Sequence, residues 1–331
     1  MKRISLVKSM LIKSIWPDAG VKATFLVDRR SRIFGLVRPD GKRGIEVGAL
    51  NRPIVREIDG DVRYADHLST EGLRLKYAED LSVNYNNFKD LVPVSVVTGT
   101  GTLANALGST EKFDYIIASH VLEHIADPIG WIIDCLDILN DDGIIFLALP
   151  DRRFTFDRYR ADTTTGELIA NYHSKAKFPT PSQVFEYYSR SESCSPEEVR
   201  DIWEGKFDKT VAVDINKLKE AVRLEIDVTH NSTYFDCHCS IFTPYSLSMI
   251  LRELISLAII PVSVDAIEAT REREAEFFVV LRKMVGSDPS QLASTVPRLD
   301  PMIDGQTPRR RLSWRSRPLH ALRILFSGRA S

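Results

Sequence analysis

Short runs of apolar residues alternate with longer stretches of helical periodicity between residues 44 and 150. Each run is nearly continuous in apolar residues, which is typical of a parallel strand buried on both faces. Ser69–Asp80 and Ile129–Leu139 predict helices between the runs. The alternation predicts an α/β fold with a doubly wound, mostly parallel, Rossmann-like sheet. The predicted strands are Gly44–Val47, Val62–Ala65, Val92–Val97, Phe113–Ala118 and Ile144–Leu149.

The chain before this core shows other patterns. Residues 1–16 place apolar residues at helical spacing among lysines, which predicts a cationic amphipathic helix. Ala23–Val27 and Ile33–Val37 predict two short strands, and Pro53 is expected to open the helix behind the first core strand.

After the core, residues 151–240 are polar, aromatic and biased towards helix. Ser195-Pro196 and Thr243-Pro244 each predict a capped helix start. Two late strands, Ile259–Val264 and Phe277–Leu281, are expected to complete the sheet. Beyond Gly286 we expect no fixed fold until the basic end of the chain.

Composition favours a large protein core in a reducing compartment. The chain has 331 residues, 44% of them hydrophobic, so a sizeable core can form without disulfides. Its four cysteines are irregularly spaced, which favours a cytoplasmic location. No apolar window is long enough to span a membrane, and Lys8 and Lys13 interrupt the only apolar stretch near the start. We therefore expect neither a spanning helix nor a secretory signal.

Charge is unevenly distributed, although its net value is only −1. Residues 1–16 and 309–331 are basic and contain no acid, so the body between them is acidic. An acidic body argues against a nucleic-acid groove, and no recognition motif accompanies the arginines. The basic ends favour peripheral contact with an anionic inner membrane surface, and a solvated tail is the alternative.

Informative residues follow the predicted strands at the edge where open parallel sheets bind ligands. Glu46 and Gly48 end the first strand, and Asp66 ends the second, where an acid suits ribose hydroxyls. Leu50 and Pro53 stand where a dinucleotide fingerprint needs glycines, and Glu46 would repel a phosphate. A positively charged, phosphate-free nucleoside fits this turn better, and S-adenosylmethionine (SAM) has these properties.

Five motifs follow one another along this core: GIEVGALNRP, YADHLSTEGLRLKY, FDYIIASHVLEHIADPIGWI, DDGIIFLALPD and RRFTFDRYR. With them the chain resembles a class I SAM-dependent methyltransferase of the methyltransferase type 11 group, and is similar to bacterial members found with polysaccharide-assembly genes. The motifs cover about Gly44 to Arg160, and a weaker similarity returns at 238–247. The resemblance implies a seven-stranded sheet, SAM as the donor, and an acceptor pocket built by segments after strands four and five.

Transferred to this sequence, the resemblance implies a set of cofactor-binding residues. The methionine half of SAM is expected to contact Glu46, Gly48, Ala49 and Asn51. The ribose is expected to contact Asp66, and the adenine Thr98 and Gly99. Ser119 is expected to form the floor beneath the sulfonium. Histidine is the natural base near neutral pH, so His120 is the first candidate and Asp151 the second. For each, a purely structural role is the alternative. His124 is the third catalytic candidate, although packing at the start of a helix suits it equally.

No metal is expected. The segment from His120 to His124 matches the H-x-x-E-H zinc signature, but that signature needs one continuous helix, and here a strand precedes the first histidine. Cys237-His238-Cys239 alternates in a way that suits a strand better than a chelate.

The expected function is O-methylation of a saccharide or lipid-linked glycan intermediate. Two alternatives remain: a non-catalytic SAM-fold binding protein, and a methyltransferase for a small aromatic or quinone acceptor. Aromatic residues in 152–188 suit either a sugar-stacking lid or a helical core. The expected organisation is an N-terminal helix and strands (1–40), the SAM-binding core (41–150), a helical acceptor or lid insertion (151–240), a helix and strands that complete the sheet (241–285), and a basic flexible tail (286–331).

Overall fold

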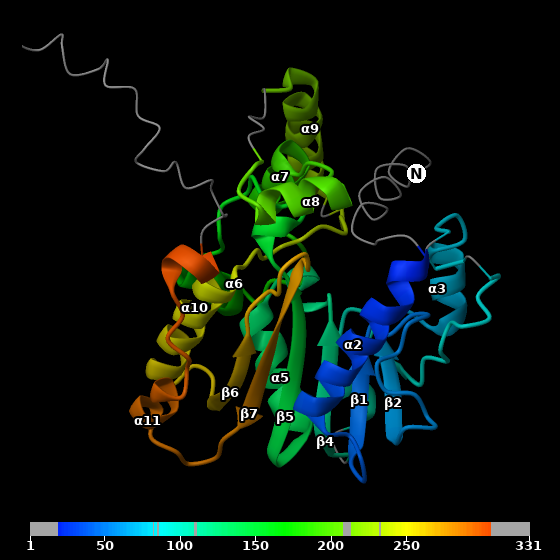
Figure 1. Ribbon diagram of the computed structural model, residues 1–331, viewed down its shortest axis with the longest axis vertical. Helices are drawn as coiled ribbons and strands as arrows, with labels where there is room; N and C mark the ends of the chain where they lie inside the picture. The colour runs from blue at the N-terminus through cyan, green and yellow to red at the C-terminus, as the bar shows by residue number, and fades with distance from the viewer. Residues whose placement is uncertain are drawn as a thin grey trace, which may run out of the picture.

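A single seven-stranded sheet forms the centre of the molecule, and helices cover both of its faces (Figure 1). The computed structural model describes residues 19–305 except 82, 85, 109–110, 208–212 and 232. The strand order is β3-β2-β1-β4-β5-β7-β6, and β7 alone runs antiparallel to its neighbours. The strands are β1 (Arg43–Val47), β2 (Asp61–Asp66), β3 (Val96–Val97), β4 (Phe113–Ser119), β5 (Leu139–Pro150), β6 (Val262–Glu268) and β7 (Glu276–Lys283). The predicted α/β class and the seven-stranded, mostly parallel sheet are confirmed.

Neighbouring residues of each central strand point to opposite faces, so each face has its own apolar cluster. Ile116 packs on one face with the helices α4 (Leu103–Leu107), α5 (Pro128–Ile138), α10 (Pro244–Ser256) and α11 (Pro289–Ser294). Ile117 packs on the other face with α2 (Ala19–Val37). Burial on both faces explains why these strands are continuous apolar runs in the sequence.

Helix α2 corrects the prediction of two strands at Ala23–Val27 and Ile33–Val37. Its buried residues Ile33 and Val37 are four positions apart, which places them on one face of a helix. The charged residues between the two predicted strands continue the helix, and Arg30 and Arg32 form ion pairs with Asp59 and Glu274. Long-range ion pairs therefore decide this element, and they cannot be recognised from local pattern.

Three other predictions about local structure are wrong. No helix follows Pro53, since residues 51–60 form turns. The third strand is only Val96–Val97 rather than the predicted Val92–Val97. The chain beyond Gly286 forms α11 and the short helix η3 (Pro301–Gly305), and Leu292 packs into the core. The predicted helix at 1–16 and the basic segment 309–331 lie outside the described residues.

The predicted helical insertion after β5 consists of α6 (Thr165–Ser174), α7 (Pro181–Arg190), α8 (Pro196–Trp203) and α9 (Ile215–Asn231). Of these, α7, α8 and α9 lie beyond the carboxyl ends of β1, β4 and β5 (Figure 1). Ser195 caps α8 and Thr243 caps α10, each with a capping box, as their sequence motifs predict. Within the described part of the chain, we find no helix that is both long and apolar enough to cross a membrane.

Candidate functional site

The order of the strands places a ligand site at the carboxyl ends of β1 and β4. The sheet grows outwards in opposite directions from these two neighbours, and such a switch point is where open α/β sheets bind ligands. The N–H of Gly48 donates to the carbonyl of Ala65, and the N–H of Thr98 donates to the carbonyl of Asp66, each over 2.9 Å. Ser119 ends β4 beside them. The structure therefore brings the segments of the predicted cofactor residues together.

Glu46 holds the loop after β1 in place. Its Oε1 accepts the N–H of Ile54 at 2.8 Å, and its Oε2 accepts the N–H of Val55 at 3.0 Å. The side chain is buried beneath this loop. Glu46 was predicted to lie beside the methionine half of SAM, but the structure turns its carboxylate to the loop backbone instead. It shapes the site rather than lining it.

Burial of Glu46 makes stability depend on pH. Burial raises the pKa of Glu46 from 4.5 to about 7, although the N–H groups of Ile54 and Val55 lower it in part. Because the folded-state pKa is the higher one, the stabilisation is fully present below about pH 4.5 and is lost as the pH rises through about 7. The difference between these two pKa values corresponds to about 3 kcal/mol of unfolding free energy.

Urea unfolding between pH 4.5 and pH 8 measures this contribution. Glu46→Gln should flatten the decline in unfolding free energy, because an amide does not ionise. Glu57→Gln, an exposed change in the same loop, should leave the decline unchanged. Equal slopes for Glu46→Gln and the unaltered protein would contradict the prediction.

Two residues in the loop after β1 have backbone angles that favour glycine, although only one of them is a glycine. Gly48 has φ +71°, and Leu50 has φ +49° where a dinucleotide fingerprint has its second glycine. Both values lie in the left-handed region, which costs a residue with a Cβ about 1–2 kcal/mol. Leu50 therefore retains the turn at the expense of backbone strain. Ala49 is buried, and Asn51 is half-buried.

Gly48→Ala is expected to lower the unfolding free energy by about 2–3 kcal/mol, from backbone strain together with a steric clash. A Cβ at this position would lie 2.9 Å from Cγ2 of Val121. Gly41→Ala is the matched control, because Gly41 has φ +65° and open space around its Cβ position. Its loss should be about 1 kcal/mol. Equal losses for the two variants in urea unfolding would show that Val121 does not restrict the loop.

The remaining predicted cofactor residues lie at the same edge. Asp66 is 7% exposed, with Oδ1 2.6 Å from Nδ1 of His67. Thr98 is half-buried and Gly99 is exposed, directly beyond the pairing of Asp66 with Val97. Oγ of Ser119 accepts a hydrogen bond of 2.8 Å from Nη2 of Arg29. The assigned contacts of these residues with SAM stay predictions.

An ion-pair network that sequence analysis missed crosses this edge of the sheet. Arg29 of α2 donates from Nε to Oε1 of Glu276 at 2.5 Å and from Nη2 to Oε2 at 2.9 Å. Nε2 of His120 lies 2.9 Å from the same Oε2. Glu276 directly precedes the apolar run Phe277–Leu281 of β7, which was the available signal, but no local pattern connects it with Arg29.

His120 lies where it was predicted, but its neighbours favour the charged imidazolium. Burial alone would lower the pKa of His120, whereas the nearby carboxylates of Glu123 and Glu276 raise it to about 9. A histidine that already holds its proton at neutral pH does not accept another. His120 as a general base therefore stays a prediction, and its ion pair with Glu276 weighs against it.

Asp151 is not available as a base in this structure. Its carboxylate has no exposed surface and pairs with Arg153, with Nη2 2.6 Å from Oδ2. The hydroxyl of Thr270 donates to the same Oδ2, also at 2.6 Å. The prediction of Asp151 as second base is corrected: it is the buried anchor of the segment after β5.

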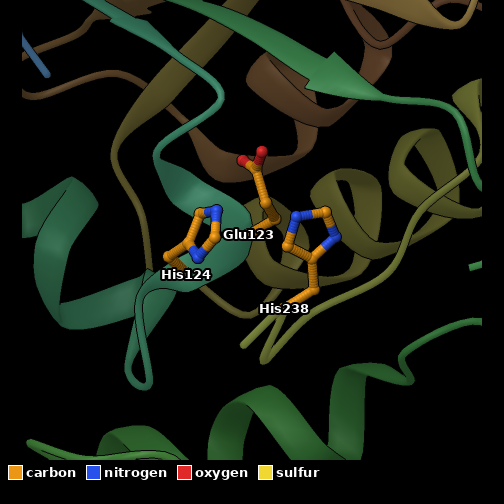
Figure 2. A group of neighbouring side chains, drawn as sticks. All are labelled: Glu123, His124 and His238. Carbon is orange, nitrogen blue, oxygen red and sulfur yellow. The ribbon is translucent and has the colours of Figure 1, made fainter. Parts of the chain in front are cut away.

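His124, the third catalytic candidate, lies in the short helix η1 (Leu122–His124) beside Glu123 and His238 (Figure 2). Its ring meets that of His238 edge-on, with the centroids 4.7 Å apart. Residues 233–241 are extended, but they form none of the strands of the described sheet, so the predicted strand around His238 is wrong. The segment instead places His238 against η1.

The aromatic residues after β5 belong largely to the protein core. Phe154 stacks on Trp203 with a centroid separation of 4.2 Å. Phe156 and Tyr187 are buried in an apolar cluster with Phe235. Of the two alternatives for this segment, a helical core therefore describes Phe154, Phe156 and Tyr187.

Comparison with protein families decides what kind of protein carries this site. The family model described as "Methyltransferase domain" matches residues 22–192, just over half of the chain. The chain belongs to this methyltransferase family. The prediction of a class I SAM-dependent methyltransferase is confirmed, whereas the narrower polysaccharide-associated group is not.

Curated relatives of this methyltransferase match only part of it. A ubiquinone biosynthesis O-methyltransferase of Parvibaculum lavamentivorans is 33% identical over 87 residues, which are 25% of this chain and 34% of that protein. A protein of the same name from Glaesserella parasuis is 29% identical over 93 residues, 27% of this chain and 39% of that protein. The chain thus spans about a third to two-fifths of the length of these relatives.

Solved structures similar to this methyltransferase include two other methyltransferases. The CurJ carbon methyltransferase is 11% identical with a TM-score of 0.40, covering 84% of this chain and 58% of that one. A SAM-dependent methyltransferase from Aquifex aeolicus is 7% identical with a TM-score of 0.35, covering 76% of this chain and 88% of that one.

The edge of the sheet in this methyltransferase fits SAM, the cofactor of its family. Asp66 lies at the carboxyl end of β2, where an acid suits ribose hydroxyls. Gly48 has no Cβ, and Cγ2 of Val121 lies only 2.9 Å from the position that a Cβ would occupy. The carboxyl group of Glu46 faces the N–H groups of Ile54 and Val55 in the loop.

Proposed function

We propose that this protein is a SAM-dependent O-methyltransferase that acts on a hydroxyl of a small aromatic acceptor. The observation that carries the proposal is the family match over residues 22–192, which includes the loop after β1 and Asp66 at the switch point of the sheet. The curated relatives over this part of the chain are named O-methyltransferases. An aromatic acceptor follows from their names, and a saccharide acceptor finds no such support.

The side chains after β5 agree with an apolar acceptor better than with a sugar. Sugar binding needs an aromatic face that is open to the ligand, beside polar groups. Phe154 and Phe156 instead have their rings packed against Trp203 and Tyr187, and both are buried. The buried arginines of this segment are also engaged, since Arg160 pairs with Asp157.

Positioning is the main contribution expected from the protein. When bound, SAM supplies a methyl group already activated by its sulfonium. Asp66 binds and orients the ribose, and the loop from Gly48 to Asn51 fixes the amino-acid end. Ser119 and His120, after β4, border the place where the acceptor hydroxyl must approach. Orientation of two reactants in this way lowers a barrier by as much as about 7–11 kcal/mol.

Two measurements with the full chain test the proposal. Calorimetry with S-adenosylhomocysteine should show one binding site per chain. Mass spectrometry should then detect a singly O-methylated product from a catechol such as 3,4-dihydroxybenzoate or a prenylated catechol, and none from sugar nucleotides or lipid-linked saccharides. Methylation of a saccharide but of no catechol would show that the acceptor is a saccharide and not an aromatic compound. Binding without turnover of any acceptor would favour the non-catalytic alternative.

A further inference from the structure

Three side chains that the proposed function does not use form a compact group beside η1. They are Glu123 and His124 of η1 and His238 of the segment between α9 and α10, here called the His–Glu cluster (Figure 2). One potential ligand atom from each lies within 4.8 Å of the other two. Figure 2 shows the two imidazole rings on either side of the glutamate side chain.

One ring nitrogen of each histidine in the cluster faces a carboxylate. Nδ1 of His238 lies 2.5 Å from Oδ2 of Asp157, and Nδ1 of His124 lies 2.9 Å from Oδ1 of Asp236. In the neutral tautomer that carries its proton on Nδ1, facing the carboxylate, Nε2 of each ring has a free lone pair. Metal-binding histidines commonly have such a carboxylate on the other ring nitrogen, because it fixes the tautomer and the orientation of the ring.

Glu123 contributes a buried carboxylate that lacks hydrogen bonds. Its side chain has no exposed surface, and neither oxygen accepts a hydrogen bond from the part of the chain that the structure describes. Its ionic partner is the ring of His120, whose Nδ1 is 3.5 Å from Oε1. This ion pair leaves both carboxylate oxygens without a hydrogen bond, and a bound cation would engage them.

The backbone holds the cluster together across a long separation in sequence. The carbonyl of Glu123 accepts the N–H of Cys239 at 2.6 Å and that of Ser240 at 3.1 Å. These bonds fasten the segment of His238 to η1. The site can be reached from solvent past His124, whose side chain is 36% exposed, whereas His238 is buried.

We propose that Glu123, His124 and His238 bind one divalent transition-metal cation through a carboxylate oxygen and two Nε2 atoms. Two imidazoles and one carboxylate suit Zn²⁺, Co²⁺ or Fe²⁺ and disfavour Mg²⁺ and Ca²⁺, which prefer oxygen ligands. In a tetrahedral zinc site neighbouring ligand atoms are about 3.3 Å apart, so the side chains close inwards by about 1 Å on loading. Three protein ligands leave a coordination position open to water or a small ligand.

The proposed site differs from the zinc signature considered in the sequence. In that signature both histidines lie on one helix, but here Nε2 of His120 is engaged by Glu276. The second histidine is His238, which comes from a distant part of the chain. The absence of a helix through His120 excludes the metalloprotease geometry but not a metal site.

Metal titration of the full chain, without SAM or acceptor, tests the site separately from the proposed function. Protein freed of metal by a chelator should bind one equivalent of Zn²⁺ by calorimetry, and its melting temperature should rise. One equivalent of Co²⁺ should give a visible spectrum of nitrogen and oxygen ligands without a thiolate charge-transfer band. Such a band would assign the metal to Cys237 or Cys239 and overturn the proposal, as would the absence of stoichiometric binding.

Two variants and a control complete the test. His238→Ala and Glu123→Gln should each weaken Zn²⁺ binding at least about 100-fold, because each removes a direct ligand. His173→Ala, which removes an exposed histidine of α6, should bind as the unaltered protein does. The melting temperature of each variant without metal verifies that the fold is retained. Unchanged affinity in both variants would overturn the proposal.

Discussion

Glu276→Ala is expected to lower the free energy of unfolding by about 3–5 kcal/mol, the cost of leaving a buried charge without its partner. Glu276 is 5% exposed and pairs with both Arg29 and His120. Its removal leaves two cationic groups close together, away from most of the solvent. Because the network joins α2, β4 and β7, the loss should appear in the global unfolding transition. Urea unfolding at pH 7 measures it.

Glu272→Ala provides the control for this change. Glu272 precedes the same strand, but its side chain is 72% exposed and pairs only with the neighbouring Arg273 in the described structure. Exposed pairs of this kind are worth little, so its loss should stay within about 0.5 kcal/mol. Glu276→Gln separates charge from volume and should retain most of the destabilisation. A decrease below about 1 kcal/mol for Glu276→Ala would show that the network does not stabilise the fold.

Asp66→Asn is expected to weaken the binding of S-adenosylhomocysteine about 100-fold. Hydrogen bonds to a charged group contribute about 1.5–3 kcal/mol, and two ribose hydroxyls would lose a carboxylate partner. The substitution changes no volume, and Asp66 lies at the end of β2, so folding should be preserved. Calorimetry gives the dissociation constant, and the urea midpoint verifies the fold.

The other end of the same strand offers a matched control. Asp61 begins β2, and its side chain is 66% exposed. Because it lies at the amino edge of the sheet, Asp61→Asn should leave the affinity unchanged. Equal affinities for Asp66→Asn and the unaltered protein would remove Asp66 from the cofactor site and with it the main support for the proposed function.

Much of the fold could be predicted because its determinants are local. Continuous apolar runs identified β1, β2, β4 and β5, since strands covered on both faces have no polar side. The cap motifs at Ser195 and Thr243 identified helix starts, since a cap needs only the next three residues. Where the decisive contact was distant, as for the arginines of α2, the same reasoning predicted the wrong element.

The candidate site also has features that could be predicted from the sequence and features that could not. Asp66, Gly48 and Ser119 follow strands, so a parallel sheet is enough to bring them to one edge. The direction of the Glu46 carboxylate was not predictable, because it depends on how the loop folds back to present the N–H groups of Ile54 and Val55. Asp151 was misjudged although its ion-pair partner Arg153 is only two residues away, because the burial of this pair and the hydrogen bond from the distant Thr270 depend on the tertiary structure.

The sequence by itself determined the class of sheet and the methyltransferase family, and it predicted which edge of the sheet carries the cofactor site. These depend on periodicity and on residues that directly follow strands. Only the tertiary structure decided that Arg29 faces Glu276 and that the ring of His124 packs against that of His238. The physical reason is that burial of a charge has to be offset by a partner, and the chain can bring that partner from any distance along its length.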